Sequence, residues 1–100
     1  MIYHLDILPG AQADIEEAAA WYEERQPGLG LDFTRTILQV IDTLPANPLI
    51  YRVRHQRRNI RWFLPPRFPY RIVYRLQGEL ITIVAIVHSA RHDRQWRKRA

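Results

Sequence analysis

The sequence FPYRIVYRL at residues 68–76 decides which fold the chain can adopt. Its side chains alternate with the period of two that a β-strand requires. One set is apolar or aromatic and the other carries two positive charges, so this strand is expected to bury one face and expose the other. The first set is Tyr70, Ile72, Tyr74 and Leu76, and the second is Arg71, Val73 and Arg75.

Two further β-rich stretches flank this strand. Residues 60–64 precede it across Pro65-Pro66, and residues 80–88 follow it across Gln77-Gly78. The glycine accepts positive φ, so the second connection fits a tight hairpin turn. Because both connections are short, the three strands are predicted to pair as an antiparallel meander.

The first half of the chain predicts one strand and two helices. Residues 2–8 are compatible with a strand, and apolar residues then recur at helical spacing over about residues 10–26 and 29–44, with Pro27-Gly28 between them. The order β-α-α-β-β-β predicts a two-layer α+β fold, with a helical hairpin packed on one face of a small antiparallel sheet. The opposite face and its arginines are then expected to stay open, and function is expected there.

Length and composition set further limits. One hundred residues suit a single domain, residues 1–100, whose last ten residues form a basic tail. The chain has no cysteine, which excludes disulfides and cysteine nucleophiles. The longest apolar run, residues 81–87, is far shorter than the roughly 20 residues of a membrane span, so a cytoplasmic protein is expected. His4, His55, His88 and His92 show no metal-ligand spacing, and neither a metal nor a cofactor is predicted.

Charge divides the sequence into opposite halves. Residues 1–50 contain two arginines and eight acidic residues, a net of −6, whereas residues 51–100 contain thirteen basic and two acidic residues, a net of +11. Of the fifteen basic residues only Lys98 is a lysine. Arginine binds phosphate or carboxylate through a planar, permanently charged group, so this half predicts a surface for an anionic partner.

Several phrases of the sequence resemble the RelE/ParE toxin superfamily over almost the whole chain, and its ParE branch more closely than its RelE branch. Their joint order and spacing make the resemblance specific. The phrases are Ala13-Asp14-Ile15 with Trp21-Tyr22-Glu23, Gly28-Leu29-Gly30 with Phe33, Asn47-Pro48 with Tyr51, Phe68-Pro69-Tyr70-Arg71-Ile72-Val73-Tyr74, Ile83-Val84-Ala85-Ile86-Val87-His88, and Arg91, Trp96 and Arg99.

This resemblance implies the toxin of a type II toxin–antitoxin pair, neutralised by a cognate antitoxin. ParE-type toxins poison DNA gyrase, whereas RelE-type toxins cut messenger RNA on the ribosome. Arg71 and Arg91 match arginines that RelE-like nucleases use for phosphate and transition-state contacts. The chain lacks their lysine-rich segment before the sheet and has Trp96 where they commonly have an acid–base tyrosine, so gyrase inhibition is the leading hypothesis.

The sequence is also compatible with other functions. A ribosome-dependent endoribonuclease is the alternative, with Arg71, Arg91 and His88 as its catalytic residues; a non-catalytic nucleic-acid-binding module and a degenerate toxin that binds only its antitoxin are further ones. His88 suits a general base, although a structural bond to the tail is favoured. Trp96 could stack on a partner or pack the tail onto the sheet, and packing is favoured; Trp21 and Tyr22 are expected to pack in the helical hairpin. The residues predicted to bind a partner or anion are Arg52, Arg54, Arg57, Arg58, Arg61, Arg71, Arg75, Arg91 and Trp96.

Overall fold

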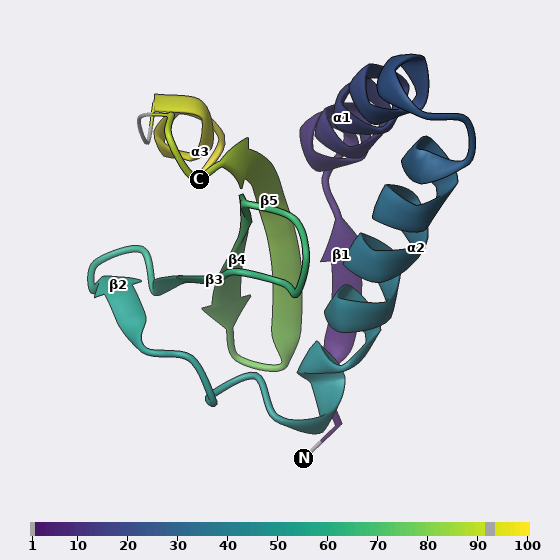
Figure 1. Ribbon diagram of the computed structural model, residues 1–100. Coiled ribbons are helices and arrows are strands. Elements are labelled where there is room, and N and C mark those ends of the chain that lie inside the picture. The colour runs from purple at the N-terminus through teal and green to yellow at the C-terminus, as the bar shows by residue number, and fades with distance from the viewer. Residues whose placement is uncertain (1, 92–93) are drawn as a thin grey trace.

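The computed structural model describes residues 2–91 and 94–100, so His92 and Asp93 of the predicted tail lie outside the described residues. Figure 1 shows two long helices side by side on one side of a sheet and a short helix on the other side. The predicted two-layer α+β class is confirmed. The elements are β1 (His4–Ile7), α1 (Pro9–Arg25), α2 (Leu29–Asp42), the 3-10 helix η1 (Leu44–Ala46), β2 (Val53–His55), β3 (Ile60–Phe63), β4 (Tyr70–Gln77), β5 (Leu80–His88) and α3 (Arg94–Arg99).

The sheet has five strands in the order β1-β5-β4-β3-β2. The predicted antiparallel meander is present as β3, β4 and β5. The prediction of a wholly antiparallel sheet was wrong: the sheet is mixed, because β1 pairs with β5 in parallel, with His4 opposite Leu80. Parallel neighbours need a long connection between them, and here all the elements from α1 to β4 lie between the two strands in the chain. Strand β2 lies in a segment that was expected to be a loop.

The core between the helices and the sheet follows the predicted alternation of β4. Ile72, Tyr74 and Leu76 are buried on this face, together with side chains from α1 and α2. Phe33 lies at its centre, with its ring 5.1 Å from those of Phe68 and Tyr70. The two helices approach so closely that a Cβ on Gly30 would lie 2.5 Å from a backbone oxygen of α1, so the position requires glycine.

The other face of the sheet is partly covered, which corrects the prediction that it stays open. Helix α3 folds back onto it and buries Trp96 to 1% exposure against Val73, Val84 and Val87. A β-bulge in β5 contributes to this packing. Val73 pairs with Ala85 and Tyr74 with Ile83, so Val84 is an additional residue in β5. The favoured packing of Trp96 onto the sheet is confirmed, but the helix was not predicted, because the neighbours of Trp96 in sequence are polar and one tryptophan gives no helical periodicity.

Within the part of the chain that the structure describes, no helix has the length and apolar character that a membrane crossing requires.

Candidate functional site: an arginine face and an adjacent groove

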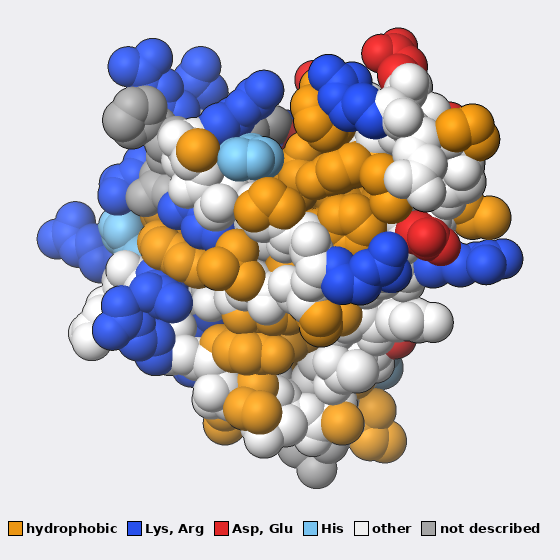
Figure 2. Space-filling view, in the orientation of Figure 1, with side chains coloured by type: hydrophobic (Ala, Val, Ile, Leu, Met, Phe, Trp, Pro, Cys, Tyr) orange, Lys and Arg blue, Asp and Glu red, His pale blue; other side chains and the backbone are white. Residues whose placement is uncertain are grey.

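Basic side chains gather on the side of the sheet away from α1 and α2. We call this surface the arginine face; it consists of the β2–β3 hairpin, the outward side chains of β4, and α3. Figure 2 shows most Lys and Arg side chains on the side of β2 and α3, whereas Asp and Glu lie toward α1 and α2. Its cations are Arg52, Arg54, Arg57, Arg58, Arg71, Arg75, Arg94, Arg97 and Lys98.

The middle of the arginine face is a half-buried tryptophan under two guanidinium groups. The guanidinium carbon of Arg54 lies 4.9 Å from the ring centroid of Trp62, and that of Arg71 lies 5.1 Å from it. Partial burial lowers the pKa of Arg54, and repulsion from the charges of Arg52 and Arg71 lowers it further. Such like-charge proximity attracts anions, because an anion relieves the repulsion.

Two arginines of this face also fasten the C-terminal segment. Arg71 Nη2 donates a hydrogen bond to the carbonyl oxygen of Arg91 at 2.8 Å, and Arg58 Nη1 donates to that of Arg97 at 2.9 Å. Both bonds bring α3 and the segment before it against strands that are distant in sequence. The sheet and the tail therefore form one continuous basic surface.

Three residues of the predicted anion-binding set are not among these cations: Arg61, Trp96, and Arg91, which lines an adjacent groove. Arg61 pairs with Tyr74 on the helix-covered face, where its Nη1 donates to the carbonyl oxygen of Tyr51, so it is not part of the arginine face. Strand alternation separates it from Arg54 and Arg71, which the linear sequence does not reveal. Trp96 was expected either to stack on a partner or to pack the tail onto the sheet. It is buried, so the structure shows the packing. It offers no ring face to a partner in this conformation.

A groove of about 610 Å³ lies beside the arginine face, between α1 and the ends of β4 and β5. Its walls combine apolar, aromatic and charged side chains; α1 contributes the acidic ones, Asp14, Glu17 and Glu24, and Arg91 contributes a basic one. Trp21 also lines it and is 49% exposed, so it does not pack within the helical hairpin as expected, whereas Tyr22 does. In Figure 2 hydrophobic side chains are exposed between the regions of α1 and α3.

His88 lies in this groove. Its Nδ1 accepts a hydrogen bond from the backbone N–H of Ala90 at 3.1 Å, and its ring meets the Tyr70 ring edge to face at 5.2 Å. The expected bond from His88 to a carbonyl of the tail is not what the side chain makes: its partner is the N–H group of Ala90, which precedes the tail. Burial raises the pKa of Tyr70.

The three residues proposed for catalysis are divided between two faces of the sheet. Tyr70 pairs with His88, whereas the next residue, Arg71, pairs with Val87. Adjacent residues of a strand point to opposite faces, so His88 faces the groove and Arg71 faces the arginine side. Arg91 lines the groove with His88 through its side chain. The Arg71 side chain thus leaves its strand on the other side from His88, and its guanidinium group reaches the carbonyl oxygen of Arg91.

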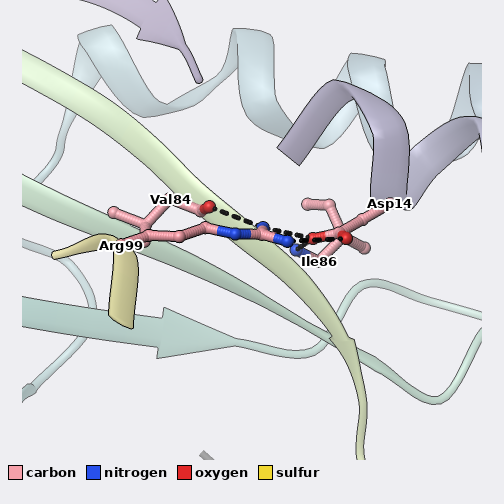
Figure 3. A network of polar contacts seen from close by, with 4 residues as sticks. All are labelled: Asp14, Val84, Ile86 and Arg99. Carbon is pink, nitrogen blue, oxygen red and sulfur yellow. Dashed lines mark hydrogen bonds and ion pairs between the residues drawn. The ribbon is translucent and has the colours of Figure 1, made fainter. Parts of the chain in front are cut away.

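An ion pair between Asp14 and Arg99 connects α1 with α3, the helices on opposite sides of the sheet (Figure 3). Arg99 of α3 donates two hydrogen bonds to Asp14 of α1, at 2.7 and 3.1 Å, and a third to the carbonyl oxygen of Val84 at 3.1 Å. Asp14 also accepts from the backbone N–H of Ile86 at 3.0 Å. The hydrogen bonds that Arg99 donates to Asp14 raise the pKa of Arg99. This bidentate pair holds α3 in place on the sheet.

Among the described residues, no three His, Asp or Glu side chains come together as metal ligands. The basic half is also little neutralised by the helical hairpin. Arg99 pairs with Asp14, and Arg67 lies 3.6 Å from Asp32. Arg52, Arg54, Arg57 and Arg58 form no ion pair with a described acidic side chain, so their charge is left for a partner.

Comparison with known proteins identifies the family. Residues 5–93 match the family described as ParE toxin of type II toxin-antitoxin system, parDE. The chain belongs to the ParE toxin family. A solved structure of a chromosomal ParDE toxin–antitoxin system from P. aeruginosa superposes with a TM-score of 0.77 and 22% sequence identity, over 87% of this chain and 96% of that one, which shows a shared fold. No curated protein matches this toxin by sequence.

Three features of this ParE toxin were not predicted from its sequence. Trp62 was interpreted only as part of a strand, and no partner was predicted for Asp14 or Arg99, which were noted in the first helix, in the tail and in the phrases of the family resemblance. An acidic residue between buried apolar positions of α1 was the available signal for Asp14, because such a carboxylate needs a partner. No local pattern marks Trp62 or Arg99, whose partners lie far away in sequence.

Proposed function

We propose that this ParE toxin stops growth by inhibiting DNA gyrase without catalysing a reaction, and that a cognate antitoxin neutralises it. Membership of the ParE family supports the target. The observation that carries the non-catalytic part is the division of Arg71 and His88 between opposite faces of the sheet. General acid–base catalysis needs its groups within reach of one substrate atom, and strand geometry keeps these two apart.

Supercoiling by purified gyrase tests the proposal. We expect the toxin to reduce supercoiling at micromolar concentration, and His88→Ala to reduce it equally, because His88 serves no reaction. Unchanged supercoiling, together with growth arrest on induced expression, would reject gyrase as the target. Absence of both effects would instead indicate a toxin that keeps only its antitoxin binding.

The endoribonuclease alternative makes a different prediction. Messages extracted during growth arrest would show codon-positioned cuts by primer extension, and the cuts would disappear in Arg71→Ala and Arg91→Ala. We expect no such cuts in the unmodified toxin. Cuts that persist in both variants would point to a contaminating nuclease, because these two arginines are the residues that match the RelE-like pattern.

The groove beside α1 is our proposed docking site for the antitoxin. Protein segments bind to grooves that combine aromatic anchors with complementary charge, and Trp21, Tyr70 and Arg91 provide both. An antitoxin segment with apolar side chains and a carboxylate for Arg91 would fit. Co-purification with the product of the adjacent gene tests this: Trp21→Ala should weaken the complex, whereas exchanging the distant exposed Leu49 for alanine should not. Equal retention of both variants would contradict the assignment.

A further inference from the structure

We propose that the arginine face binds the sugar–phosphate backbone of double-stranded DNA. Its composition is the first argument. Residues 43–78, which include the β2–β3 hairpin and most of β4, contain no acidic residue, and α3 contains none. Exposed cations without intervening carboxylates form a positive field that concentrates polyanions.

The distribution of the charges favours a polymer over a small anion. The cations extend from the β2–β3 hairpin to α3, and the hydrogen bond from Arg58 to the Arg97 carbonyl keeps these elements adjacent. The longest dimension of the molecule is 40 Å. Phosphates recur along a duplex at regular short intervals, so a surface with many separate guanidinium groups matches it better than one phosphate or carboxylate would.

Aromatic side chains distinguish a duplex from a single strand. Proteins that hold single strands stack bases on exposed aromatic rings. On the arginine face Trp96 is buried, and the ring of Trp62 already lies under the guanidinium groups of Arg54 and Arg71. No aromatic ring of the described face is therefore open for stacking. Contacts from guanidinium groups to phosphates position a duplex without reading its sequence.

Apolar side chains distinguish DNA from an acidic protein. Protein interfaces depend on apolar or aromatic anchors at their centre. The apolar residues of this face, such as Ile60, Val73 and Val84, are buried beneath α3. Among the described residues, the exposed large apolar side chains belong to other parts of the molecule: Ile2, Trp21, Leu31, Leu49, Ile50, Leu64 and Leu80.

Several arginine side chains of this face are held in fixed positions, which suits the binding of a duplex. Arg54 and Arg71 rest on Trp62, and Arg71 and Arg58 are fixed by bonds to backbone carbonyls. Side chains that are already ordered lose less conformational entropy on binding. The identity of the natural ligand rests on the proposed function: it is the duplex on which gyrase acts, so that the toxin contacts both the enzyme and its DNA.

Fluorescence anisotropy of a labelled 20-base-pair duplex tests the inference. For the whole toxin, the logarithm of the association constant should fall with the logarithm of salt concentration, with a slope of about −0.9 for each phosphate contacted. Arg52→Gln with Arg57→Gln should make this slope shallower by about 2 and weaken binding roughly tenfold or more at 0.1 M salt. The matched control is Arg25→Gln with Arg35→Gln on the helical hairpin, which removes the same net charge and should bind almost as the unmodified toxin does.

Three results would overturn the inference. They are salt-independent or absent duplex binding, equal losses in both double variants, and tighter binding of a single strand or of polyglutamate than of the duplex. Supercoiling measured with the same preparations keeps the two proposals apart. Inhibition of gyrase without duplex binding would remove only the inference, whereas duplex binding without inhibition would remove only the gyrase proposal.

Discussion

The two faces of one sheet have opposite chemistry in this toxin. The helix-covered face buries apolar and aromatic side chains under two long helices. On the other side of the sheet, among the described elements, only α3 packs against the strands. This helix of six residues is part of the arginine face, and most of the charged groups of that face reach solvent. The same strand supplies both faces: Ile72 and Tyr74 point one way, Arg71 and Arg75 the other. Alternation allows one strand to build a core and a binding surface at once.

The plane of the sheet separates the side chains expected to stabilise the fold from those proposed to bind a partner. Large side chains on the helix-covered face are expected to determine the free energy of unfolding. Cations on the arginine face are expected to contribute little to stability, because surface charges rarely do. The ion pair of Asp14 and Arg99 is the exception, since it connects the two layers through the ends of α1 and α3.

The largest expected effect comes from the centre of the helix-covered face. Phe33→Ala should lower the free energy of unfolding by about 3–5 kcal/mol, because it removes a fully buried ring and leaves a cavity. Urea denaturation measures the loss. Trp96→Ala on the other face should cost about 3 kcal/mol, at the lower end of this range, since α3 can detach and take Arg99 away from Asp14 while the sheet stays paired. Trypsin should then cut at residues 94–99 first. Equal global losses would contradict the asymmetry between the faces.

The connection between the layers should give the next largest effect. Arg99→Ala should lower the free energy of unfolding by about 3 kcal/mol, because it removes two hydrogen bonds and a positive charge from the nearly buried carboxylate of Asp14. Asp14→Ala should cost a similar amount, and the double variant should cost less than the two together. Arg25→Ala is the control, since its pair with Glu24 is long, at 3.9 Å, and exposed. Strict additivity in this cycle would show that the pair contributes no coupling.

Alkaline pH should destabilise the helix-covered face. Burial raises the pKa of Tyr74 to about 12 from its ordinary 10.0. Above pH 10 the unfolded chain loses a proton that the folded chain keeps, so stability is fully present below pH 10 and falls by up to about 2 kcal/mol as pH rises to 12. Urea midpoints at pH 9, 10 and 11 should decline less in Tyr74→Phe, which lacks the phenol. Parallel declines in both proteins would assign the loss to other groups.

The smallest effect is expected on the arginine face. Arg52→Gln should change the free energy of unfolding by less than about 0.5 kcal/mol, and at low salt it should be slightly stabilising, because it removes repulsion toward Arg54. Thermal unfolding at two salt concentrations measures this, with Arg35→Gln on α2 as the control for net charge. A clear destabilisation by Arg52→Gln would show that the face also contributes to folding.

Much of the architecture was predictable because its patterns are local. The alternation at residues 68–76 and the helical spacing of the first half predicted the layers and the meander, which the structure confirms. Strand β2 was missed because three residues with charged neighbours give a weak pattern, as is common for an edge strand. Helix α3 was missed because its burial depends on one side chain, Trp96.

The candidate site was predicted less completely. Charge asymmetry pointed to Arg52, Arg54, Arg57 and Arg58, which the structure places together on the basic side of the molecule. The same reasoning placed Arg61 among them, although pairing with Tyr74 puts it on the other face. Linear density of charge predicts a surface, but strand register decides which of the charges share it.

The amino-acid order by itself determined the two long helices, the strands of the meander, the opposite charges of the two halves and the family resemblance, because each depends on neighbours in sequence. Only the tertiary structure decided that Arg99 meets Asp14, that Trp62 lies under Arg54 and Arg71, and that His88 and Arg71 face apart. Those relations depend on how strands pair and helices fold back, and contacts between distant segments have no signature in a local pattern of residues.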